Sequence, residues 1–215
     1  MTPASSLLRC VIGGLLVAFT TAIPAQAQFD ESYSSSPASV SPTTWSPPPT
    51  MDTNPHTLST KRIASQHRHL VRVAAWGGSN ALGGAALWAT ADANDWRAFG
   101  LQSGLWGAIN VGIAATGLLG SDDPTDDWQD AVSAERNYSD ILLANLGLNV
   151  GYMGVGTAMV LASGQGVDRA SDWRGHGTAL ILQGLGLFVL DAISWAASRD
   201  RLSTLLNRSS PPATR

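Results

Sequence analysis

The chain has almost no cysteine or lysine and little charge of either sign. Cys10 is the only cysteine and Lys61 the only lysine among 215 residues, and charged residues make up 13% of the chain. A net charge of −3 without a basic stripe argues against a nucleic-acid partner. A single cysteine excludes an intramolecular disulfide, and no cysteine-ligated metal site is expected.

The first 27 residues have the layout of a secretory signal peptide. Arg9 precedes an apolar run from Val11 to Ile23, and the small-x-small sequence Ala25-Gln26-Ala27 follows it. Cleavage after Ala27 leaves a mature chain that begins at Gln28 and contains no cysteine, which also excludes thiol catalysis.

A polar tail is predicted to follow, over residues 28–65. It is rich in serine, proline and threonine, and such a composition buries too little apolar surface to offset the entropy of ordering, so we expect disorder. Basic residues then approach the first apolar stretch, and we interpret them, histidines included, as charge near lipid headgroups rather than as metal ligands. They are Lys61, Arg62, His67, Arg68, His69 and Arg72.

Four apolar stretches predict an all-α fold, a four-transmembrane-helix bundle over residues 66–200. The predicted spans are 70–91, 99–120, 138–163 and 175–197, each at or above the roughly 20 residues that cross a bilayer as a helix. The lipid bilayer is therefore the expected partner. Residues 201–215 are expected to form a flexible C-terminal tail.

The connection between the second and third spans is strongly acidic. Asp123-Pro124 resembles a helix N-cap followed by proline at the first helical position, which predicts a short interfacial helix. A calcium loop is the alternative, but the central glycine of an EF-hand loop is absent.

A short repeat suggests two tandem helical hairpins. Asp95-Trp96-Arg97 and Asp172-Trp173-Arg174 each precede an even-numbered span. Aspartate at a helix start, tryptophan at the headgroups and arginine near phosphate account for the motif in structural terms.

Asp191 is a carboxylate well inside the fourth span, where insertion of a charge costs about 2.5–3.5 kcal/mol. Counting inward from the span ends at about 1.5 Å per residue places Asn145 and Trp76 at its depth, and these are its predicted partners, with Arg72 one turn further out.

One amide per span lies at similar depth near the midplane and predicts a central polar layer, which consists of Asn80, Asn110, Asn149 and Gln183. This layer either specifies helix pairing or lines a ligand pocket or proton path, and both interpretations stay open. No nucleophile–base pair is visible, so we expect no enzyme activity, no metal and no cofactor. The expected function is that of a structural or accessory membrane bundle, and the alternative is a small oligomeric transporter or lipid-binding protein.

Small residues at helical spacing predict close helix contacts. Gly100-x-x-x-Gly104 and Gly147-x-x-x-Gly151 have this spacing, and they serve either the bundle or a homo-oligomer. A cleaved signal peptide places the N-terminal tail on the exported side of a bacterial inner membrane, whereas the distribution of Lys and Arg favours the opposite orientation. We follow the signal peptide.

These residues together resemble DUF6992, an uncharacterised family of bacterial membrane proteins. The resemblance covers about residues 66–197 and rests on four segments: Trp76-Gly77-Gly78-x-Asn80, Trp106-x-x-x-Asn110, Asn145-x-Gly147-Leu148-Asn149-Val150-Gly151-Tyr152, and Gln183-Gly184 followed by Asp191. The family pattern implies aspartate where this chain has Asn149, and bulkier residues around Phe188. The resemblance implies the helical membrane fold and no activity.

Overall fold

The computed structural model describes residues 54–120 and 122–208, and side chains as far as residue 206. The predicted signal peptide, residues 28–53 of the predicted tail and residues 209–215 lie outside this part of the chain. The described residues form four helices, and no strand occurs among them.

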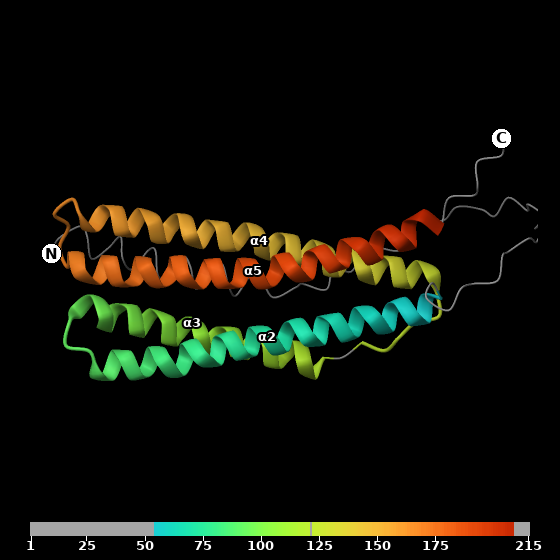
Figure 1. Ribbon diagram of the computed structural model, residues 1–215, viewed down its shortest axis with the longest axis horizontal. Coiled ribbons are helices and arrows are strands. Elements are labelled where there is room, and N and C mark those ends of the chain that lie inside the picture. The colour runs from blue at the N-terminus through green and yellow to red at the C-terminus, as the bar shows by residue number, and fades with distance from the viewer. Residues whose placement is uncertain (1–53, 121, 209–215) are drawn as a thin grey trace, which may run out of the picture. The chain divides into compact units, whose positions relative to one another are not determined.

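The four helices follow one another with short connections (Figure 1). They are α2 (Pro55–Thr90), α3 (Asn94–Leu119), α4 (Trp128–Ser163) and α5 (Ala170–Arg208). The all-α prediction is confirmed. α2 packs chiefly on α3 and α4 chiefly on α5, so the two predicted hairpins are present, and α3 packs on α5 to join them.

All four helices extend beyond the predicted spans, α3 only at its start, which is Asn94 rather than residue 99. Residues 55–65, which we expected to belong to the disordered tail, form the first turns of α2, because Asn54 caps the helix and Pro55 supplies its first position. α4 begins at Trp128 and is capped by Asp127, which accepts hydrogen bonds from the backbone of Gln129 and Asp130. The cap is therefore not Asp123, and the expected interfacial helix is the first part of α4. At the other terminus, α5 continues to Arg208, so residues 201–208 are helical rather than a flexible tail.

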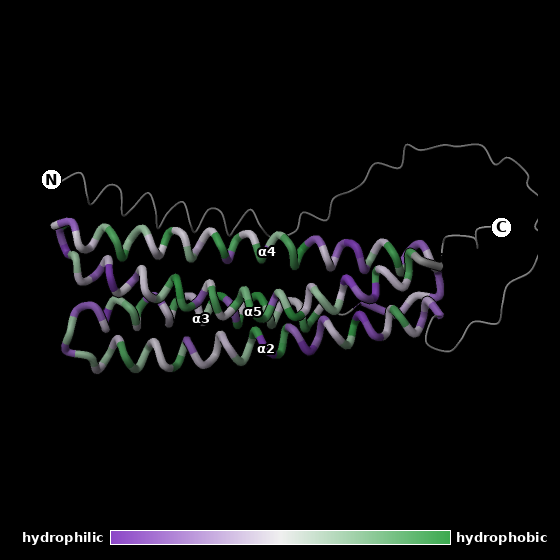
Figure 2. Tube along the Cα trace, turned by 45° about the horizontal axis from the view of Figure 1, so that its top comes forward, coloured by the Kyte–Doolittle hydropathy of each residue, from purple (hydrophilic) through white to green (hydrophobic). Residues whose placement is uncertain are grey.

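The extensions pack against one another where α3 is absent. Leu58 of α2, Ala131 of α4 and Leu205 of α5 form an apolar cluster, with Trp128 and Val132 against it. Figure 2 shows hydrophilic residues concentrated on these ends of α2, α4 and α5, whereas the middle of each helix is mainly hydrophobic. The bundle thus has an apolar four-helix portion and a more polar three-helix portion.

Glycines set the distances within the hairpins. A Cβ added to Gly84 of α2 would lie 2.4 Å from the backbone nitrogen of Gly104, and one added to Gly100 would lie 2.7 Å from the carbonyl oxygen of Gly84. The Gly100-x-x-x-Gly104 pair therefore serves the bundle. Gly147 and Gly151 have nothing within 4 Å of an added Cβ and lie on an open face of α4.

Large apolar side chains cover the outside of all four helices. Leu82, Leu105, Leu161 and Ile193, one from each helix, are each more than half exposed. α4 and residues Ala170–Leu206 of α5 are long and apolar enough to cross a membrane, and only 22% and 33% of their most apolar windows are buried. Two of the four predicted spans therefore meet the length and composition test.

Candidate functional site

Asp191 lies at the centre of a buried hydrogen-bonded network that joins α2, α4 and α5. Its Oδ2 accepts a hydrogen bond from Asn149 Nδ2 at 2.7 Å, and its Oδ1 lies 3.2 Å from His69 Nε2. The other ring nitrogen of His69, Nδ1, is 2.8 Å from Ser194 Oγ. All four residues are no more than 6% exposed. The carboxylate expected to need a partner has two, Asn149 from its own hairpin and His69 from the other.

The order of these groups allows two proton arrangements. With a neutral imidazole, His69 donates from Nε2 to Asp191 and accepts at Nδ1 from the Ser194 hydroxyl. With an imidazolium, both ring nitrogens donate, and Asp191 and His69 form a buried ion pair. In both arrangements every polar atom of the imidazole is satisfied, which a buried polar group requires.

The predicted partner of Asp191 on α4 is wrong by one helical turn. Asn145 is half-buried and makes no hydrogen bond with Asp191 in the described part of the chain, whereas Asn149, one turn along α4, does. Side chains on a helix lean towards its N-terminus. Since α4 and α5 run antiparallel, side chains at the same depth on the two helices lean in opposite directions. A residue of α4 that reaches Asp191 must therefore lie about one turn closer to the C-terminus of α4 than the residue at equal depth, which is why the partner is Asn149 and not Asn145.

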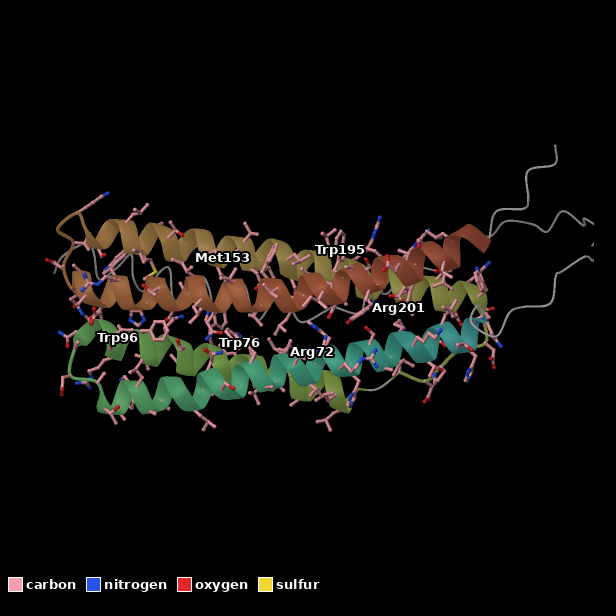
Figure 3. All side chains as sticks on the ribbon, viewed as in Figure 1. Arg72, Trp76, Trp96, Met153, Trp195 and Arg201 are labelled. Atoms are coloured by element: carbon pink, nitrogen blue, oxygen red, sulfur yellow. The ribbon has the colours of Figure 1, made fainter. Side chains whose placement is uncertain are left out.

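Trp76, the other predicted partner of Asp191, makes its hydrogen bond to a different residue. Its Nε1 donates to Gln183 Oε1 at 3.1 Å and therefore not to Asp191. Trp76 and Arg72 line one side of a largely apolar groove of about 620 Å³ between α2 and α5 (Figure 3). Arg72 makes no hydrogen bond or ion pair with another residue in the described ranges. Leu190, which precedes Asp191 in the chain, also lines the groove.

The four amides of the expected central layer do not form one connected set. Asn110, Asn149 and Gln183 are buried, but the side chain of half-buried Asn80 donates to the carbonyl of Trp76 in its own helix. Within residues 54–120 and 122–206, no hydrogen bond joins two of these amides. The side-chain nitrogens of Asn110 and Gln183 are buried without a partner, as is the hydroxyl of Ser103.

A second buried cluster lies in the three-helix portion. The Glu135 carboxylate, 1% exposed, accepts two hydrogen bonds from Arg201, each at 2.9 Å, and a third from Ser198. Sequence reasoning missed this cluster because it assigned Arg201 to a flexible tail. On α5, Asp191, Ser194, Ser198 and Arg201 follow at intervals of three or four residues, so the two clusters share one face of the helix.

His69 was missed for a related reason. The prediction placed it before the first span, in a run of exposed basic residues. The buried face of α2 includes Gly84, Gly77, Val73 and His69, at intervals of seven and four. Continuing the glycine pattern towards the N-terminus would have identified the histidine.

A comparison with known sequences gives a match that covers part of the network. The sequence profile of a family of unknown function, DUF6992, matches residues 72–192, which include Trp76, Asn149, Gln183 and Asp191. The chain belongs to the DUF6992 family. No curated protein and no solved structure matches it. The DUF6992 match begins after His69 and ends before Ser194, so the network extends beyond the matched region at both ends.

Proposed function

We propose that this DUF6992 protein is a non-enzymatic, multi-pass membrane protein in which all four helices cross the bilayer. Its role is structural or accessory, and the polar network fixes the helix arrangement. The observation that carries the proposal is the Asn149–Asp191–His69–Ser194 chain, which joins three helices inside a bundle whose outer surface is apolar.

The surface supports the membrane placement. Exposed Leu82 and Leu105 show that α2 and α3 carry apolar side chains outward as α4 and α5 do. Lipid would cover these side chains without requiring a further protein partner. The N-terminal tail and the α3–α4 connection are assigned to the exported side.

The geometry around Ser194 argues against an acyl-transfer enzyme. Ser194, His69 and Asp191 occur in the order of a catalytic triad, but Ser194 is 4% exposed. It lines neither the groove between α2 and α5 nor the cavity formed by the starts of α3 and α5. Its backbone N–H lies within α5, so it is used in the helix rather than directed at an oxyanion. A serine without substrate access or oxyanion donors does not support hydrolysis.

Unfolding in detergent micelles tests the proposal directly. Asp191→Asn should lower the free energy of unfolding, whereas Asp140→Asn, which changes an exposed carboxylate on the same hairpin, should leave it within about 0.5 kcal/mol of the parent. Equal stability of the two variants would remove the locking role from Asp191.

A second candidate, a small proton-linked transporter, is favoured by the unpartnered nitrogens of Asn110 and Gln183. These buried donors need water or a ligand, and with Trp76 they continue the polar path from the Asp191 network into the bundle. In proteoliposomes with an internal pH-sensitive dye, this function predicts proton flux that Asp191→Asn abolishes. Flux equal to that of empty liposomes, or unchanged by the substitution, would reject it.

A further inference from the structure

The two Asp-Trp-Arg motifs meet at the end of the bundle opposite the three-helix portion. Asp95 of the first motif forms a 3.1 Å ion pair with Arg174 of the second. Asp172 of the second motif pairs instead with Arg169, which precedes it by one turn. Arg97, the remaining charged member, has no carboxylate partner in the described part of the chain.

A cavity of about 350 Å³ opens beside this unbalanced arginine. Its lining comes from the end of α2 (Trp88), the first turns of α3 and the start of α5. The polar groups in the lining are Asn94, Arg97, Arg169, Ser171, Asp172 and His176. Arg97 and Arg169 outweigh Asp172, so the cavity carries a net positive charge.

Two further features of the cavity favour an anion. α3 begins at Asn94 without a side-chain cap, since Ala93 occupies the N-cap position, and the N-terminal ends of α3 and α5 both contribute to the lining. The Asp95 carboxylate accepts from the N–H of Trp96, which leaves the N–H groups of Asn94 and Asp95 in the first turn. Uncapped N–H groups at a helix start bind anions. His176 also lines the cavity, and its buried Nδ1 has no hydrogen-bond partner.

We propose that this cavity binds a phosphate group. Phosphate offers several strong acceptor oxygens, which match the planar fork of Arg97, the Arg169 guanidinium and the N–H groups of Asn94 and Asp95 at the start of α3. Trp96, at the start of α3 and packed edge-on against Phe99, lies at the same end of the bundle (Figure 3). The phosphate belongs either to an anionic lipid headgroup at the bilayer surface or to a small soluble molecule.

The first experiment uses the full mature chain in a neutral detergent without added lipid. Inorganic phosphate is titrated at constant ionic strength, and the melting temperature is followed. Phosphate should stabilise the protein, and Arg97→Gln should weaken its apparent affinity about tenfold or more, since a charge-assisted bond is lost. Arg68→Gln is the matched control. It removes an exposed arginine from the N-terminal half of α2, away from the cavity, and this variant should bind phosphate as the parent does.

The second experiment compares nanodiscs of phosphatidylcholine with nanodiscs that also contain phosphatidylglycerol. Stabilisation by phosphatidylglycerol that Arg97→Gln removes and Arg68→Gln keeps assigns the site to a headgroup. Stabilisation by inorganic phosphate in both the detergent and the phosphatidylcholine nanodisc assigns it to a soluble phosphate.

Absence of any Arg97-dependent effect in both experiments would overturn the proposal. So would an equal loss in Arg97→Gln and Arg68→Gln, because that result indicates a diffuse charge effect. Only the headgroup assignment rests on the proposed membrane placement. The detergent titration is independent of it and of Asp191, so failure of one proposal is distinguishable from failure of the other.

Discussion

Replacing Asp191 by asparagine changes one atom of the buried network and keeps its shape. The carboxylate accepts from Asn149 at 2.7 Å and meets His69 at 3.2 Å. An amide has a single side-chain oxygen, so it can accept from one of these donors while its NH₂ group faces the other. With the Nε2–H tautomer or the imidazolium of His69, one buried donor is therefore left without an acceptor.

The expected cost follows from that unsatisfied donor. A buried polar group without its partner costs about 1–3 kcal/mol in protein interiors. Interhelical hydrogen bonds measured inside membranes average lower, about 0.6 kcal/mol. Asp191→Asn should therefore destabilise the protein by about 1–3 kcal/mol, and a value near the lower limit is expected if lipid-embedded segments find other partners when the bundle opens.

A double-mutant cycle isolates the pair from its surroundings. His69→Phe, Asp191→Asn and the double variant are unfolded reversibly by increasing the fraction of a denaturing detergent in mixed micelles. Residues in one network give coupling energies of about 0.5–3 kcal/mol, so the two single costs should exceed the cost of the double variant. Strictly additive costs would show that His69 and Asp191 do not stabilise each other, and the structural argument would fail.

Three further predictions concern packing, the second cluster and membrane placement. Gly84→Ala should destabilise the bundle by about 1–3 kcal/mol in the same unfolding assay, because the added Cβ would overlap the α3 backbone, whereas Gly147→Ala, on the open face of α4, should be neutral or slightly stabilising. Arg201→Gln should lower the free energy of unfolding by about 3–5 kcal/mol, because it leaves the buried Glu135 carboxylate without its cation. The control Arg199→Gln, which loses a cation–π contact with Trp195, should lower it by about 1 kcal/mol or less. Similar costs for the two variants would contradict the buried ion pair. In a cysteine-free background, Ser203→Cys should react with a membrane-impermeant maleimide from the exported side, and Ala93→Cys and Gln165→Cys only after permeabilisation; labelling of Ala93→Cys from outside would contradict four spans.

Counting residues inward from the ends of the predicted spans was enough to find which residues lie inside the bundle, but it did not show which of them are paired. It identified Asp191, Asn149 and Gln183 as interior residues, and they are buried. It paired Asp191 with Asn145 because it compared Cα depths, whereas hydrogen bonds form where leaning side chains meet. It also ended each helix where hydrophobicity ended, and so assigned His69 and Arg201 to exposed segments.

The sequence by itself determined the four helices, their order in two hairpins and the anomalous carboxylate, because apolar runs, turns and helical spacing are local properties of the chain. Only the tertiary structure decided the partners of Asp191. His69 precedes it by 122 positions, and the rotation of α2 about its own axis, set by the glycine contacts with α3, determines that the histidine points inward. Such a rotation depends on packing between helices. The spacing of the glycines in α2 reflects it, but that spacing does not show that Asp191 is the partner of His69.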